Sequence, residues 1–183
     1  GLKHVAQIYL NSAGAELRRA QRFVYPGIRV TAYDGNGSQT RSLGRENFGQ
    51  QGGIDVIGRC GLIGAAPQVA EQALQLLLAP NTPQGKRDLL LMPDQMILQI
   101  HESIGHPLEL DRILGDERNY AGTSFVKASD FGSLQYGSRL LNVTFDPTIA
   151  EQLASYGFDD DGTPAHKEFL IREGLLLRPL GGA

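Results

Sequence analysis

A six-residue segment, His101-Glu102-Ser103-Ile104-Gly105-His106, places the strongest constraint on how this chain folds. Its two histidines are five positions apart, and on a regular α-helix that spacing puts the second ring about 140° away from the first. For the rings to act together, the backbone must leave regular helical geometry between them. Gly105 can adopt φ values that other residues avoid, and Pro107 disfavours the α region at His106. We therefore predict a helix over residues 94–105 that ends at Gly105–His106 and turns His106 back towards His101.

The side chains of this segment are of the types that form a hydrolytic metal centre. Neutral imidazole is a good zinc ligand, and catalytic zinc usually has three protein ligands and one open position. Glu102 can serve beside His101 and His106 as a general base that activates water. The alternative is a partly exposed helix end, at which His106 interacts with the negative end of the helix dipole.

A third metal ligand is harder to identify from the sequence. Glu109 and Asp111 follow the second histidine closely and can reach a metal if the chain turns back at Pro107. We favour the other interpretation, a solvated acidic segment that precedes Arg112. Three further candidates have simpler roles as surface or packed residues, namely His4, His166 and Cys60.

The first half of the chain has the pattern of β-strands followed by a helix. Four strand-like segments are separated by turn residues at 11–14, by the break Pro26-Gly27 and by the hairpin signal at 34–37. They predict an antiparallel meander over residues 4–45, with strands at 4–10, 15–25, 28–33 and 39–43. Apolar residues then recur at helical spacing from Pro67 to Leu78, which predicts a helix that packs against the meander.

The second half predicts a strand–helix unit and a β-rich segment. The loop at 81–85 separates a middle α+β region, residues 1–84, from the start of a metal-binding domain, residues 85–183. The apolar run at 86–92 is typical of a buried strand that precedes the motif helix. Further predicted elements are strands at 123–126 and 140–145, a turn at 159–164, and a hairpin formed by 168–171 and 175–177. The fold class is α+β, and the chain's start without Met and its end just after a strand indicate a fragment of a larger fold.

Composition excludes several classes of partner. The formal net charge is −3, and no Lys/Arg-rich block suggests nucleic acid. No apolar run approaches the roughly 20 residues needed to cross a bilayer. The single cysteine, Cys60, excludes an internal disulfide framework and predicts a reducing, cytoplasmic location.

The chain resembles the TldD/PmbA family of bacterial and archaeal metallopeptidases over nearly its whole length. The resemblance is carried by His101-Glu102-x-x-x-His106 with Leu108-Glu109 and Asp111 after it, and by Asn11-Ser12-x-Gly14, Ala32-x-Asp34-Gly35, the Ala70–Leu78 segment, Phe158-Asp159-Asp160-Asp161-Gly162-Thr163-Pro164 and Leu170-Ile171-x-x-Gly174-Leu175-Leu176. It implies that His101 and His106 are metal ligands and that Glu102 is the general base. The family takes a further ligand from a cysteine far downstream, and it has a glycine where this chain has Pro107.

The resemblance also implies a function and a partner. Family members are similar to peptidases that act on unfolded peptides inside a closed two-subunit assembly, and this chain resembles the motif-bearing subunit. We therefore expect a metal-dependent peptidase with zinc, or iron or another divalent metal that imidazole suits. The alternatives are a non-catalytic binding or assembly subunit that has lost its metal, and a metal-dependent hydrolase that acts on other substrates.

Overall fold

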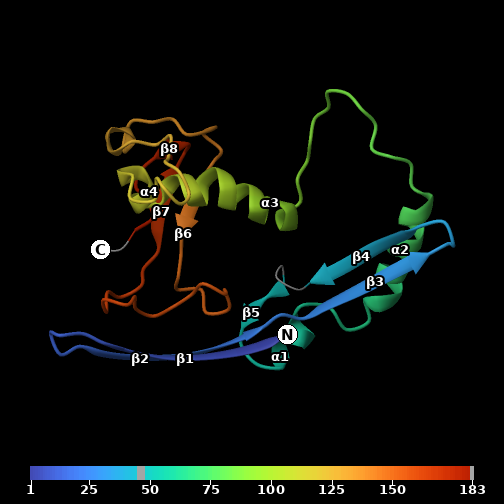
Figure 1. Ribbon diagram of the computed structural model, residues 1–183, viewed down its shortest axis with the longest axis horizontal. Helices are drawn as coiled ribbons and strands as arrows, with labels where there is room; N and C mark the ends of the chain where they lie inside the picture. Colours follow the sequence, from blue (N-terminus) through green and yellow to red (C-terminus); the bar gives the residue numbers. More distant parts are fainter. Residues whose placement is uncertain (45–47, 182–183) are drawn as a thin grey trace. The chain divides into compact units, whose positions relative to one another are not determined.

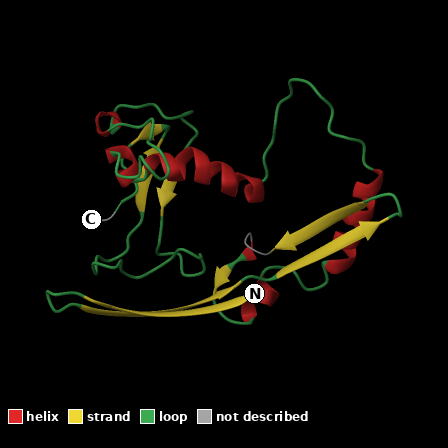
Figure 2. Ribbon diagram, in the orientation of Figure 1, coloured by secondary structure: helices red, strands yellow, loops and turns green. Residues whose placement is uncertain are grey.

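The computed structural model describes residues 1–44 and 48–181. The chain forms two compact units, one made of Gly1–Arg87 with Ile149–Ser155 and the other of Asp88–Thr148 with Tyr156–Ala183. Both combine helices with antiparallel strands, so the protein is of the α+β class (Figure 2). Among the described residues, no helix is both long enough and apolar enough to span a bilayer.

The first unit is built on two β-hairpins. Its elements are β1 (Leu2–Leu10), β2 (Glu16–Val24), β3 (Gly27–Tyr33), β4 (Ser38–Gly44), β5 (Gln50–Gln51), α1 (Asp55–Arg59) and α2 (Ala66–Leu78). The strands join in the orders β1-β2-β5 and β3-β4. Asp34 closes the β3–β4 turn by accepting hydrogen bonds from the N–H groups of Asn36 and Gly37, each 2.9 Å long. Helix α2 begins with a proline in its first turn and packs on β3 and β4, with Val69 and Ala73 buried (Figure 1).

The short segment 149–155 belongs to the first unit although it lies far along the chain. The N–H of Gln51 donates to the carbonyl of Glu151 at 2.8 Å. The side-chain amides of Gln21 and Gln51 donate to the carbonyl of Ser155 at 2.9 and 2.7 Å. Two glutamines of the first hairpin and of β5 thus hold this segment by its backbone.

The second unit places a helical run against a small antiparallel sheet. Its elements are α3 (Pro93–Ile100), the π turn η2 (His101–Gly105), the 3-10 turns η3 (His106–Leu108) and η4 (Ala128–Asp130), α4 (Leu110–Leu114), β6 (Val143–Phe145), β7 (Glu168–Arg172) and β8 (Leu175–Leu176). The sheet order is β6-β7-β8, and Figure 1 shows the helical run beside it. Among the described residues, the buried side chains of the core between them are Ile104, Leu108, Val126, Leu170, Ile171 and Leu176.

The predicted hairpins and the helix at 67–78 are confirmed, but the single meander over residues 4–45 is wrong. Within the described part of the chain, β2 pairs with β1 and with β5 at Phe23–Gln51, and it does not continue into β3. Pro26 lies between β2 and β3 and has no N–H to donate, so it breaks the ladder there. Residue 45, the predicted end of the meander, lies outside the described residues.

Two predicted strands are also wrong. The described residues 86–92 form no strand, and the side chains of Leu89 and Leu90 are 80% and 89% exposed. An apolar run indicates a strand only if a neighbouring strand satisfies its backbone, and no described strand pairs with this segment. Residues 123–126 are also not a strand, because Ser124 bonds instead to the carbonyl of Pro107 and to the N–H of Val126. The predicted strand at 140–145 is shorter, beginning at Val143.

Candidate metal centre

The motif lies where α3 changes into a π turn. The N–H of His106 donates to the carbonyl of His101, an i→i+5 hydrogen bond that widens the helix by one residue. The backbone of His106 stays in the α region, with φ −59° and ψ −44°. The prediction that the helix ends at Gly105–His106 is therefore wrong. The helical path continues into η3, and the extra residue in the turn brings positions 101 and 106 to one face.

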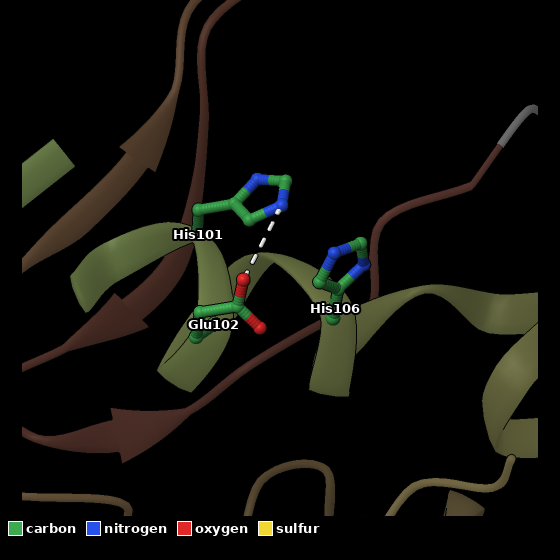
Figure 3. Close-up of side chains that lie close together, drawn as sticks. All are labelled: His101, Glu102 and His106. Carbon is green, nitrogen blue, oxygen red and sulfur yellow. Dashed lines mark ion pairs between the residues drawn. The ribbon is translucent and has the colours of Figure 1, made fainter. Parts of the chain in front are cut away.

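Three side chains of the motif converge on that face (Figure 3). The rings of His101 and His106 meet edge to face, with centroids 4.2 Å apart and 72° between their planes. One ligand atom from each ring and one carboxylate oxygen of Glu102 all lie within 4.8 Å of one another. His101 Nε2 lies 3.8 Å from Glu102 Oε1, and these two side chains are 55% and 61% exposed. The His106 side chain is 32% exposed, so all three groups have contact with solvent.

A hydroxyl from a distant segment supports the π turn. Pro107 has no N–H, so it cannot make the helical hydrogen bond to the carbonyl of Ser103, four residues earlier. The hydroxyl of Tyr136 donates to that carbonyl at 2.6 Å. Burial raises the pKa of Tyr136, which keeps the hydroxyl protonated as this donor. Sequence reasoning missed Tyr136, because the missing N–H of Pro107 reveals the acceptor but not its donor.

The opposite face of the motif anchors it in the core. Ile104 is 7% exposed and Leu108 is fully buried, and both pack in the cluster with Leu170 and Leu176. Burying each such side chain contributes about 1.5–3 kcal/mol. The chemically active face is therefore carried by a helical segment whose reverse side is fixed by packing against β7 and β8.

Glu109 joins the second histidine to an arginine. Its Oε1 lies 2.9 Å from His106 Nδ1, and its Oε2 accepts a hydrogen bond of 2.9 Å from Arg112 Nε. Burial raises the pKa of Glu109, but the hydrogen bonds from His106 and Arg112 outweigh that effect, so the pKa lies below its usual range. The favoured interpretation of Glu109 as a simply solvated residue is thus wrong. Asp111 accepts a hydrogen bond of 2.8 Å from the N–H of Arg112.

None of the remaining candidates, His4, His166 and Cys60, is a member of this cluster within the described part of the chain. The group of possible ligands found among the described residues consists of His101, Glu102 and His106. His166 instead pairs with Glu168 at 2.9 Å. The thiol of Cys60 donates to the carbonyl of Ile57 at 3.3 Å within the first unit.

The donor set fits a divalent transition metal. Two imidazoles and a carboxylate suit zinc or another metal of intermediate softness, and they lie on one exposed face. The carboxylate that contacts the other nitrogen of His106 is the arrangement usual for a metal-binding histidine. His101 and His106 are the residues that would hold such an ion, with Glu102 beside them.

Similarity to known proteins agrees with this geometry. Residues 84–180 match the PmbA/TldA metallopeptidase C-terminal domain. The chain belongs to the PmbA/TldD metallopeptidase family.

Individual relatives support this assignment. The chain is 29% identical over 168 residues to a metalloprotease of Methanothermobacter thermautotrophicus, covering 92% of this chain and 34% of the relative. It is 33% identical over 150 residues to metalloprotease slr0863 of Synechocystis, covering 81% of this chain and 29% of that relative. Its fold resembles TldE from Thermococcus kodakarensis, with a TM-score of 0.54 at 19% identity, over 93% of this chain and 35% of that one. The chain thus spans about a third of the length of the curated relatives it matches.

Proposed function

We propose that this chain carries the metal-binding and proton-transfer groups of a peptidase, with His101 and His106 as metal ligands and Glu102 as general base. One observation carries the proposal: the ligand atoms of these three residues gather within 4.8 Å on an exposed helical face. Membership of a family described as metallopeptidases supports the reaction class.

Each group has a defined task in peptide hydrolysis. A divalent metal supplies Lewis-acid chemistry, which polarises a carbonyl and acidifies water. Glu102 accepts the proton of the attacking water and then delivers it to the leaving amine. Its side chain is 61% exposed, so both water and an extended peptide can approach it. His101 and His106 act as neutral ligands, which requires an unprotonated nitrogen on each ring.

The metal we propose is zinc, because two imidazoles suit it well and leave positions for a further protein ligand and a water. The chain spans only part of the length of its relatives, and we expect the third protein ligand outside residues 1–183. In the TldD/PmbA family this ligand is expected to be a cysteine, a role that Cys60 does not match because its thiol lies outside the described cluster.

The proposed substrates are peptides or unfolded segments of proteins, taken from the peptidase class of the family. The likeness to the TldE fold supports a partner subunit of related structure, in a homodimer or heterodimer. The single cysteine in the sequence supports a reducing, cytoplasmic location.

Cleavage of unstructured peptides by the full-length protein tests this function. Cleavage should stop with a chelator and return with zinc. Glu102→Ala should reduce kcat about 10²–10⁴-fold while zinc content stays at the parental level. Asp94→Ala, at the opposite end of the same helical run, removes one carboxylate as a control and should cleave at the parental rate. If Glu102→Ala cleaves as fast as the parent, the proposed role is wrong.

Metal analysis separates the peptidase from a non-catalytic assembly subunit. The peptidase requires stoichiometric metal that is lost in His101→Ala, whereas the assembly subunit contains none. The metalloprotease relatives favour the peptidase. A panel of ester, amide and peptide substrates then distinguishes a peptidase from another metal-dependent hydrolase.

A further inference from the structure

We propose that Glu109 is a positioning residue, which holds the His106 ring in one orientation and one tautomer so that Nε2 is the nitrogen offered to the metal. This inference rests on the proposed function, because it concerns the ligand role of His106. It adds a residue that lies outside the motif and does not itself join the cluster of ligand atoms.

The contact between the two side chains determines the tautomer. Glu109 Oε1 lies 2.9 Å from His106 Nδ1. A carboxylate can only accept a hydrogen bond, so Nδ1 must carry the proton. In the neutral ring the lone pair is then on Nε2, which is the form that a metal needs. A carboxylate in this place also raises the basicity of a coordinating imidazole.

The other oxygen of Glu109 is held by a fixed arginine. Arg112 Nε donates to Oε2 at 2.9 Å, and its Nη1 donates to the carbonyl of Ala121 at 3.0 Å. The Arg112 side chain is only 15% exposed, so it has little freedom to move away. Its Nη2 lies 3.5 Å from His106 Nδ1, much further than the carboxylate, so Glu109 is the principal partner of that nitrogen.

The backbone of Glu109 is also clamped on both sides. The N–H of Leu180 donates to the carbonyl of Leu108 at 2.6 Å, and the N–H of Leu110 donates to the carbonyl of Leu180 at 2.8 Å. Glu109 therefore sits in a short parallel bridge to Leu180. The backbone of Glu109 and one of its carboxylate oxygens are therefore both fixed. The other carboxylate oxygen can then set the orientation of the His106 ring that it contacts. An ordinary surface ion pair, which contributes little to stability, has no such support.

Zinc affinity of the full-length protein, measured by competition with a chromophoric chelator, tests the inference. Glu109→Ala should weaken zinc binding about 10–100-fold, as loss of such a partner typically does. Glu109→Gln keeps a neutral acceptor and should fall between Ala and the parent. The matched control is Glu117→Gln, because Glu117 lies 3.8 Å from Arg112 and belongs to the same acidic surroundings. It should bind zinc with parental affinity.

Nitrogen-15 NMR of the histidine rings in the metal-free protein gives a second, direct readout. In the parent, His106 should show a protonated Nδ1 and an unprotonated Nε2. In Glu109→Ala it should show a mixture of tautomers. This measurement does not depend on activity. If Glu109→Ala folds poorly, the same NMR measurement is made on Glu109→Gln.

The possible failures are distinguishable. If His106→Ala binds zinc as the parent does, the proposed function is wrong. If His106→Ala loses zinc while Glu109→Ala keeps both parental affinity and the Nδ1-protonated ring, the metal site stands and the positioning role is overturned. Equal weakening in Glu109→Ala and Glu117→Gln would also overturn it, because that result would reflect the local charge alone.

Discussion

His101 and His106 lie edge to face at 4.2 Å between ring centroids although five positions separate them. The i→i+5 hydrogen bond between their own backbones creates this proximity. On a regular helix the same residues would lie on different faces. The spacing and the π turn therefore belong together, and whatever stabilises the turn also stabilises the pairing of the rings.

Tyr136→Phe should destabilise the protein and weaken the site. The change removes the hydroxyl that donates to the carbonyl of Ser103 at 2.6 Å. Loss of such a hydrogen bond typically lowers the free energy of unfolding by about 1 kcal/mol. Urea unfolding of the full-length protein measures this loss, and chelator competition should show weaker zinc binding because the π turn is less rigid.

Pro107→Ala provides the matched background for that experiment. The substitution restores a backbone N–H, which can reach the carbonyl of Ser103 in regular helical register. In this background, Tyr136→Phe should lower the free energy of unfolding by less than it does in the parent, giving a measurable coupling in a double-mutant cycle. Equal losses in both backgrounds would show that Tyr136 does not substitute for the missing N–H.

Leu108→Ala should lower the free energy of unfolding by about 2–5 kcal/mol, because it leaves a cavity at a fully buried position. Leu114→Ala, in the neighbouring helix α4, is the control. Leu114 is 64% exposed, so this change should stay within about 0.5 kcal/mol of the parent. Denaturant unfolding measures both. Similar losses would contradict the assignment of the core to the reverse face of the motif.

Gly174→Ala should be the more damaging of two glycine substitutions. Gly174 has φ +77°, and an added Cβ would lie 2.6 Å from the carbonyl oxygen of Ser138. Gly122 has φ +84° with no atom within 4 Å of the added Cβ, so Gly122→Ala reports the conformational cost alone, about 1–2 kcal/mol. Thermal unfolding should therefore show a larger fall in Tm for Gly174→Ala. Equal falls would mean that the β7–β8 turn does not pack closely on residue 138.

We expect the free energy of unfolding to depend on pH through the ionisation of the Glu109 carboxylate. Its pKa is lowered in the folded state, so its contribution is fully present above the unfolded value of about 4.3 and is lost as the pH falls through the lower folded value. The parent should therefore exceed Glu109→Gln in free energy of unfolding near neutral pH, and the difference should shrink in acid. Urea titrations at several pH values measure it. A difference that grows as the pH falls below about 4 would contradict this sign.

Local sequence signals predicted the hairpins and the long helix because their causes are local. Asp34 and Gly35 specify a turn by their own chemistry, and the proline in the first turn of α2 marks where that helix starts. The turn at Glu173–Gly174 is a similar case, since both residues have positive φ. These elements need little information from the rest of the chain.

The errors arose where distant residues decide the structure. Gly105 and Pro107 both indicate a helix end, yet the helical path continues, and Tyr136, 33 positions from Ser103, donates to the carbonyl that Pro107 cannot reach with an N–H. The role of Glu109 depends likewise on Arg112 and on the bridge to Leu180. The sequence identified the three side chains that cluster, and their roles as ligands and base remain predictions.

Residues 149–155 have a consequence for how this protein can be divided. They belong to the first unit, although the residues on both sides of them belong to the second. The polypeptide therefore passes from one unit to the other three times, and no single cut separates them. A shortened chain that begins at residue 88 would carry Ser155 without Gln21 and Gln51, the glutamines that hold its carbonyl. Recombination between relatives at one crossover point would meet the same problem, so the two units are expected to be inherited together.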